Sequence, residues 1–255
     1  TAVCDIRRQE EVKSMVRGIQ TSLGPIDVMI NNAGVIQTGP IESMTVDDYE
    51  NSMKTHFYGP LFTIEAVLPE MLKRKRGRII NIASIGGRIS VPHLLPYCAS
   101  KHALVGFTLG LRSELQKHGI SVTAICPGLM RTGSPRNALF KGQHKKEYAW
   151  FKTSDSIPIV STGAERAARQ ILEVASVGRA FYVVGLPHKL ADKLHALAPG
   201  FVTKVLGWIN YSLPGYGGLE QDQLPGFASE SSWSKSWVNG LTERAALENN
   251  EHWTS

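Results

Sequence analysis

The chain has 255 residues, of which 42% are hydrophobic and 20% are charged. These proportions are ordinary for a globular protein with a buried core, and they exclude a disordered chain. The formal net charge of +6 is compatible with an anionic partner. A mildly basic surface explains this charge better than nucleic-acid binding, so we predict no nucleic-acid partner.

The cysteines and the apolar runs indicate where the protein resides. Cys4, Cys98 and Cys126 are widely spaced and show no metal-ligand pattern, which favours a reduced chain without a metal site. No apolar run reaches the roughly 18 residues that span a bilayer. The chain also does not open with a charged and then apolar signal segment. We therefore expect a cytoplasmic protein.

Hydrophobic periodicity predicts helices and short apolar strands that alternate along the chain. Residues 10–23 have the apolar spacing of one helical face, and residues 26–30 form a short run that is apolar on both faces. A long helical pattern follows over residues 45–75, with Thr45 as its N-cap. The pattern then predicts a strand at 78–83, a helix at 100–117, a strand at 120–126, a helix at 164–176 and a strand at 180–184.

Strands separated by helices of this length predict right-handed crossovers and a parallel sheet. We therefore predict an α/β fold with a doubly wound, mostly parallel sheet. Residues 1–186 are expected to form this domain. Residues 187–255 are expected to be a C-terminal extension of the same domain, with an amphipathic helix followed by a tail rich in Gly, Pro and Ser.

The amphipathic stretch over residues 190–213 carries apolar residues and several lysines. It could cover a lipophilic substrate pocket, lie in a subunit interface or rest on a membrane surface. Pocket cover or an interface is the favoured pair of alternatives. We accordingly expect a homo-oligomer, and membrane-surface contact stays open as the less favoured alternative.

Four motifs that could take part in catalysis or ligand binding follow predicted strands or open the helices after them. In an open parallel sheet, ligands bind beyond the carboxyl ends of the strands, so these motifs should share one edge. Each motif is weak alone, but four at one edge are hard to ascribe to chance. They are Asn31, Asn32, Ala33 and Gly34; Ser84; Tyr97 with Lys101; and Pro127, Gly128 and Thr132.

The pair Tyr97 and Lys101 suits acid–base chemistry if the segment is helical, because residues four apart share one helix face. A free tyrosine titrates near 10, too high for efficient acid–base work at neutral pH. A neighbouring ammonium lowers that pKa. The Ser84 hydroxyl could donate to a carbonyl oxygen while Tyr97 transfers the proton.

The order N-N-A-G, S, Y-x-x-x-K and P-G-x-x-x-T resembles the short-chain dehydrogenase/reductase family, over about Val3 to Val184. The resemblance implies a Rossmann-like fold and an NAD(P)-dependent oxidoreductase. The implied reaction interconverts an alcohol and a ketone or aldehyde by hydride transfer. The cofactor would be NAD or NADP, and the substrate a small molecule with a slight lean toward hydrophobic compounds.

The resemblance also implies a role for each motif. Ser84 would polarise the substrate oxygen, Tyr97 would be the general acid/base, and Lys101 would lower the pKa of Tyr97 and hydrogen-bond the nicotinamide ribose. The remaining positions would contact the cofactor: Asp5 and Ile6 the adenine; Asn31, Asn32, Ala33 and Gly34 the adenosine side; and Pro127, Gly128 and Thr132 the nicotinamide amide.

The sequence departs from the family pattern at two places. His56 stands where the family commonly has an asparagine that holds a proton-relay water. It is either a passive substitution in helix packing or a relay member, since imidazole titrates near neutrality. The Gly-rich turn that cradles a pyrophosphate is not in this sequence. The first residues also look like the end of a strand. We therefore expect the sequence to be N-terminally incomplete, with two βα units of on the order of 50 residues before Thr1.

Two questions stay open at the level of sequence. The residues that decide between NAD and NADP follow the second strand of such folds, which is absent here. The chain could also be a catalytically silent NAD(P)-binding regulator or scaffold, or an epimerase or dehydratase on the same fold. The intact set of Ser84, Tyr97 and Lys101 favours the oxidoreductase.

Overall fold

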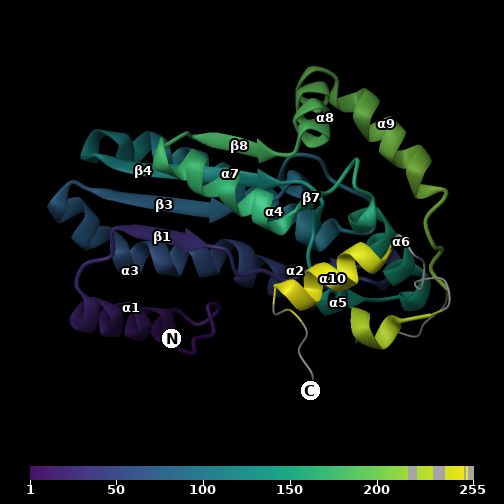
Figure 1. Ribbon diagram of the computed structural model, residues 1–255, viewed down its shortest axis with the longest axis horizontal. Coiled ribbons are helices and arrows are strands. Elements are labelled where there is room, and N and C mark those ends of the chain that lie inside the picture. The colour runs from purple at the N-terminus through teal and green to yellow at the C-terminus, as the bar shows by residue number, and fades with distance from the viewer. Residues whose placement is uncertain (218–222, 232–238, 250, 252–255) are drawn as a thin grey trace.

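The computed structural model describes residues 1–217, 223–231, 239–249 and 251. Its central sheet has four strands in the order β1(Val28–Asn31), β3(Gly77–Ile82), β4(Ile120–Pro127) and β8(Phe181–Val184), and every neighbouring pair is parallel. All four arrowheads in Figure 1 point toward the same end of the molecule. The predicted parallel sheet is confirmed.

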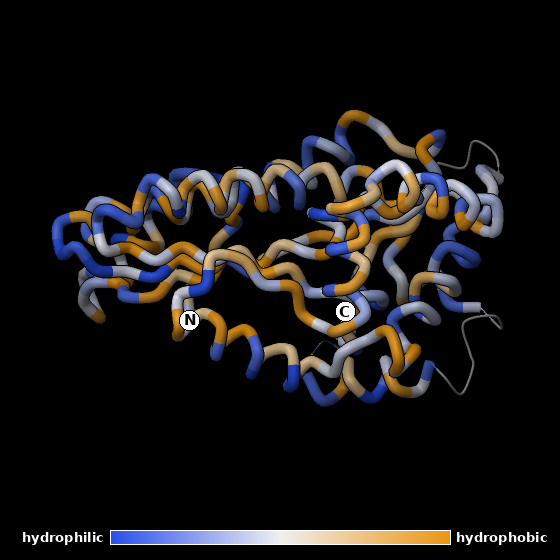
Figure 2. Tube along the Cα trace, turned by 90° about the horizontal axis from the view of Figure 1, so that it is seen from above, coloured by the Kyte–Doolittle hydropathy of each residue, from blue (hydrophilic) through white to orange (hydrophobic). Residues whose placement is uncertain are grey.

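Helices cover both faces of this sheet because its central strands are apolar on both sides. On one face Ile79 and Val122 pack against residues of α1(Gln9–Leu23) and α3(Gly59–Arg74). On the other face Ile80 packs with residues of α7(Ala164–Ser176). Figure 2 shows the strands as a layer between helices, so the sheet is doubly wound, as predicted.

The long helical segment predicted over residues 45–75 is present, with a change of winding at its centre. It consists of α2(Val46–Met53), the π-helix η2(Lys54–Tyr58) and α3. The backbone N–H of Thr45 donates to the carboxylate of Asp48 at 2.7 Å and so satisfies a group at the start of α2. A π-turn inside a helix is often found at functional sites, and here it presents His56 to the interior.

Two boundaries differ from the prediction. The helix predicted from Ser100 is α4(Leu95–Leu115), which begins five residues earlier with Pro96 in its first turn, where proline is readily accommodated. Residues 1–5, expected to hold the end of a strand, form none. A strand needs a hydrogen-bonded neighbour, and no described strand pairs with these residues.

The amphipathic stretch predicted over residues 190–213 is two helices, α8(Leu186–Leu197) and α9(Pro199–Asn210). Ala198 separates them because the residue before a proline is disfavoured in helical conformation. Neither helix contains a buried residue. In Figure 1 they form an arm at the carboxyl end of β8.

The remaining elements lie around the carboxyl end of the sheet or connect its helices and strands. Beside the main sheet, short strands form two small sheets, neither of which was predicted. One has the order β2(Gln37–Thr38), β6(Leu139–Phe140) and β9(Leu224–Pro225), and the other pairs β5(Met130–Arg131) with β7(Thr162–Gly163). The other short elements are η1(Ile41–Ser43), η3(Ile85–Gly87), η4(Gln116–His118), α5(Ser134–Asn137) and η5(Gly226–Ser229).

In the part of the predicted extension that the structure describes, α10(Gly240–Glu248) packs against α6(His144–Ser156). Residues 218–222, 232–238, 250 and 252–255 of that extension lie outside the described residues. No helix in the described ranges is long and apolar enough to cross a membrane.

Candidate active site

The three predicted catalytic side chains meet beyond the carboxyl end of β3. Ser84 follows that strand, and its hydroxyl accepts a hydrogen bond from the Gly86 backbone N–H at 3.0 Å. Tyr97 and Lys101 lie on successive turns of α4, with the Lys101 Nζ 5.7 Å from the centre of the Tyr97 ring. Lys101 also donates to the carbonyl of Ile82 at 2.8 Å. That bond holds the ammonium against the end of β3.

Gly86 lies between the serine and the tyrosine. A Cβ atom added there would lie 3.1 Å from Tyr97 Cε1 and 3.4 Å from Ser84 Oγ. The first of these separations is tighter than ordinary van der Waals contact, so a side chain would push the phenol away from the serine. The requirement for glycine here comes from close approach to these two groups.

The environment of the site shifts the pKa of both titratable groups. Tyr97 is partly exposed as a residue, but its phenol lies deep, and desolvation raises its pKa well above the ordinary value. The nearby Ser84 hydroxyl offsets part of this rise. Burial lowers the pKa of Lys101 to about 8. The lowering of the Tyr97 pKa expected from the helical spacing is therefore outweighed by desolvation of the phenolate.

His56 lies against the catalytic turn with both ring nitrogens bonded. Its Nε2 accepts from the Val35 backbone N–H at 3.1 Å, and its Nδ1 lies 2.7 Å from the Ser100 Oγ. Because the Ser100 hydroxyl donates to the Tyr97 carbonyl, we assign the ring proton to Nδ1. Burial, with a smaller effect of Lys101, lowers the His56 pKa to about 2. These bonds favour the packing alternative for His56.

The ring of His56 also fixes the orientation of Tyr97. The two rings meet edge to face, with centroids 5.3 Å apart and planes at 90°. Such aromatic pairs are favourable beyond the area that they bury. His56 thus positions the phenol even though its own nitrogens are engaged.

The segment from Asn31 to Gly34 leaves exposed backbone beyond β1. The Asn31 amide donates to Asn81 Oδ1 at 2.8 Å and accepts from the Thr63 hydroxyl at 2.6 Å, so this side chain holds the turn in place. Asn32, Ala33 and Gly34 are exposed. A Cβ on Gly34 would lie 3.1 Å from the imidazole of His56. Small residues here leave room for a flat ligand to approach the backbone.

Asp5 and Ile6 lie on the segment before α1. The guanidinium and backbone N–H of Arg7 hydrogen-bond the Asp5 carboxylate and lower its pKa to about 2. Ile6 packs so closely on Gly59, at the start of α3, that an added Cβ would lie 2.8 Å from it. Thr63, which bonds Asn31, lies one turn further along α3. The two predicted adenosine-side segments are therefore brought to the same end of α3.

The segment from Pro127 to Thr132 follows β4 and contacts the arm. A side chain on Gly128 would overlap the imidazole of His188, the third residue of α8. The His188 Nε2 accepts from the Leu129 backbone N–H at 3.3 Å, while its buried Nδ1 has no partner among the described residues. The Thr132 hydroxyl lies 2.8 Å from that of Ser134. Glycine at position 128 is thus required by the approach of α8.

These features fit the nicotinamide half of a dinucleotide. Exposed backbone at residues 32–34 offers a flat contact surface. Lys101 has three donors, of which one is bonded to Ile82. The Gly-rich turn that would bind the pyrophosphate is not in this sequence. Within the described ranges, no group of three or more His, Cys, Asp or Glu residues could hold a metal ion.

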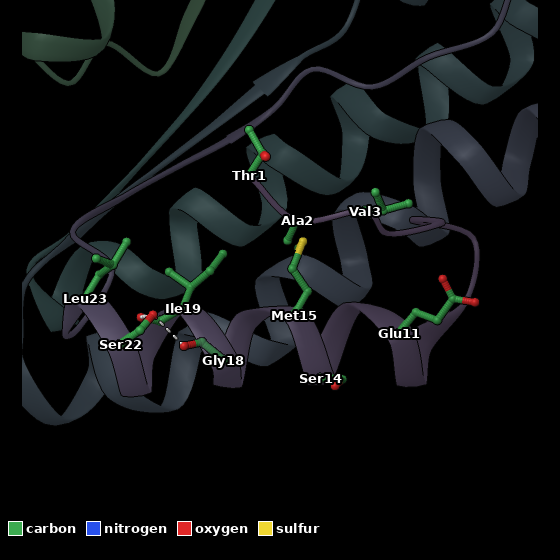
Figure 3. A pocket seen from close by; sticks show the side chains of 10 residues that line it. All are labelled: Thr1, Ala2, Val3, Glu11, Ser14, Met15, Gly18, Ile19, Ser22 and Leu23. Atoms are coloured by element: carbon green, nitrogen blue, oxygen red, sulfur yellow. Dashed lines mark hydrogen bonds between the residues drawn. The ribbon is translucent and has the colours of Figure 1, made fainter.

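A separate groove lies between the N-terminal residues and α1, and Figure 3 shows the side chains that line it. Its volume is about 590 Å³. None of its lining residues is a predicted site residue, and the catalytic turn does not contribute to it. The lining residues are Thr1, Ala2, Val3, Glu11, Ser14, Met15, Gly18, Ile19, Ser22 and Leu23.

The sequence did not reveal four residues that the structure places around the site. Ser100 and Asn81 bridge predicted site residues, and their signal was present as polar residues beside the motifs. His188 and Asp155 come from α8 and α6, far along the chain. Only tertiary packing brings these two elements to the sheet edge.

Comparison with known proteins identifies the family. The family model described as short chain dehydrogenase matches residues 1–140. The chain belongs to this family. Dehydrogenase/reductase SDR family member 7B from Bos taurus is 31% identical over 207 residues, which are 81% of this chain and 62% of that protein. Gluconate 5-dehydrogenase from Gluconobacter oxydans is 35% identical, over 52% of each chain. The chain thus spans about half to three fifths of these relatives.

A solved structure shows the same fold. The structure titled "ElxO with NADP Bound" superposes with a TM-score of 0.60 at 25% sequence identity, and the match covers 71% of this chain and 73% of that one.

Proposed function

We propose that this chain carries the catalytic centre of an NAD(P)-dependent oxidoreductase that interconverts an alcohol and a ketone or aldehyde. The convergence of Ser84 and Tyr97 at Gly86, with the Lys101 ammonium beside the Tyr97 ring at the end of β3, carries this proposal. The names of the dehydrogenase and reductase relatives and the NADP in the ElxO structure support it.

The nicotinamide, when bound, supplies the hydride in reduction and accepts it in oxidation. The Tyr97 hydroxyl gives its proton to the substrate oxygen in reduction and takes it back in oxidation. The Ser84 hydroxyl donates a hydrogen bond to the same oxygen. Because the pKa of Tyr97 is raised, the phenol keeps its proton at neutral pH, which suits proton donation in reduction.

Lys101 supports the phenolate that remains after the proton has left. Its ammonium lies 5.7 Å from the Tyr97 ring centre, and its pKa of about 8 keeps it charged at neutral pH. Its two remaining donors would hydrogen-bond the nicotinamide ribose. Desolvation around the site strengthens this attraction, because the effective dielectric is lower there than in water.

The remaining predicted contacts belong to the cofactor. Asp5 and Ile6 would contact the adenine, Asn31, Asn32, Ala33 and Gly34 the adenosine side, and Pro127, Gly128 and Thr132 the nicotinamide amide. The proposed enzyme acts on a small-molecule substrate as a homo-oligomer in the cytoplasm.

The proposal is tested with the full-length protein against a panel of alcohols and ketones, with either nicotinamide cofactor, by following NAD(P)H absorbance. We expect turnover with at least one ketone and one cofactor. Cofactor binding without turnover of any compound would instead support the catalytically silent alternative. Calorimetric titration of NADH and NADPH provides that second measurement.

A further inference from the structure

Asp155 is a buried carboxylate that the proposed mechanism does not use. It lies in the last turn of α6 and is only 4% exposed. Within the described part of the chain, neither of its oxygens has a hydrogen-bond or ion-pair partner. The other buried carboxylates of this region are paired: Glu147 with His93, and Asp48 with Lys141. Asp155 is therefore an exception that needs an explanation.

The helix that carries Asp155 packs on the catalytic turn. Tyr148 and Phe151 of α6 belong to one buried cluster with Cys98 of α4, and Tyr97 packs against that cluster. Asp155 follows Phe151 by one helical turn, so the two side chains lie on the same face of α6. Asp155 therefore lies beside the cluster on which Tyr97 packs.

Burial keeps Asp155 protonated at neutral pH, because it raises the pKa of this carboxyl group to about 8. At higher pH the carboxyl ionises before Tyr97 does, and its charge then adds to the raised pKa of Tyr97. Lys152, one turn earlier on α6, does not neutralise it, because its ammonium is paired with Glu243 and Glu230. A neutral carboxyl group can both donate and accept a hydrogen bond.

We propose that Asp155 binds a second hydroxyl group of the substrate, away from the carbon that reacts. A hydroxyl both donates and accepts, so it satisfies a neutral carboxyl group without adding charge to a desolvated site. An ammonium group would instead require the carboxyl to ionise there. The substrate class that follows is a hydroxyketone or its diol. This inference rests on the proposed oxidoreductase function.

The desolvation cost of the Asp155 carboxyl group supports the assignment. Confining a carboxyl group to a position that is only 4% exposed costs hydration energy, and an apolar side chain at the same place would not carry this cost. Residues at binding sites often trade stability for function in this way. Asp155 thus marks where the substrate supplies the missing partner.

The test compares reduction of cyclohexanone with that of its 2-, 3- and 4-hydroxy derivatives by the full-length protein. The rigid ring fixes the distance between the reacting carbonyl and the added hydroxyl. We expect one hydroxy derivative to exceed cyclohexanone about tenfold in kcat/KM, mainly through a lower KM. Asp155→Leu should abolish that ratio.

Two further variants make the result decisive. Asp155→Asn keeps a donor and an acceptor, so it should retain most of the preference. Thr153→Leu adds the same side chain on the same helix at a half-exposed position and should behave like the parent protein. A preference that survives Asp155→Leu, or turnover without any preference, would overturn the role of Asp155 alone. Absence of turnover with every ketone would instead refute the proposed function, and this inference with it.

Discussion

The catalytic turn of α4 and the π-turn that carries His56 touch each other but differ in how their polar groups are used. In the π-turn, both nitrogens of His56 are bonded, to Val35 and to Ser100. In the catalytic turn, Lys101 has one bonded donor out of three. The Tyr97 hydroxyl has Ser84 nearby as its polar neighbour.

This difference separates positioning residues from reacting ones. Polar groups whose hydrogen bonds are complete within the fold hold the site in shape. Groups with unused hydrogen-bonding capacity can bind a substrate or cofactor. By the same criterion Asp155 belongs with Tyr97 and Lys101, although it lies on another helix.

The largest effect is expected for Tyr97→Phe, which removes the proton donor and leaves the ring. General acid–base catalysis contributes about 10²–10⁴-fold, so kcat/KM for ketone reduction should fall by about that factor. Tyr58→Phe removes a hydroxyl from an exposed ring and should leave the rate unchanged. Both are measured by NAD(P)H absorbance. Undiminished activity of Tyr97→Phe would contradict the mechanism.

The second effect concerns stability and separates Asp155 from His56. The folded protein keeps the Asp155 proton up to about pH 8, whereas the unfolded chain releases it near pH 4. Because the unfolded chain binds fewer protons between these limits, Asp155 makes the free energy of unfolding fall as pH rises, by up to about 1.4 kcal/mol per pH unit. Below pH 4 this contribution is constant.

Asp155→Asn removes that slope. The variant should therefore gain stability over the parent protein as pH rises from about 4 to 8, as measured by urea unfolding at several pH values. His56 has the opposite sign, because its depressed pKa makes stability fall toward acid, between about pH 6.5 and pH 2. Parallel stability curves for the parent and Asp155→Asn would show that this carboxyl is not desolvated.

A smaller effect is expected at Gly86, where the two reacting hydroxyls meet. Gly86→Ala places a methyl group 3.1 Å from Tyr97 Cε1, which must shift by a few tenths of an ångström. Since a displacement of about 1 Å can cost 10²-fold, we expect kcat to fall about tenfold. Gly110→Ala is the matched control, because an added Cβ there meets nothing within 4 Å. It should raise stability by up to about 1 kcal/mol without changing kcat. Equal kcat in both variants would show that Gly86 is not a point of close approach.

The sheet could be predicted from the sequence because its signals are local. Buried parallel strands such as β3 and β4 are short, largely apolar runs bounded by glycine or proline, and the helix between them has its own periodicity. The break at Ala198 could also have been predicted, since Pro199 stands in the sequence. The short strand pairs could not, because two-residue strands carry no periodicity.

The site could be predicted only where motifs follow strands directly. Ser84, Tyr97 and Lys101 lie at strand ends or on the helix that follows, and the parallel topology brings them together. Asp155 comes from a helix between two loops, and its importance appears only through burial and the lack of a partner. The raised pKa of Tyr97 likewise depends on desolvation, which the i, i+4 spacing does not contain.

The smallest effect on catalysis is expected for His56→Asn. With a pKa of about 2, the imidazole stays neutral across the working pH range, and both of its nitrogens are already bonded. The pH–rate profile between about pH 5 and pH 9 should therefore keep its shape. The shorter side chain cannot reach both Val35 and Ser100, so stability should fall by about 1–3 kcal/mol. A titration step that disappears from the profile in His56→Asn would place the imidazole in proton transfer and would end the distinction between the two turns.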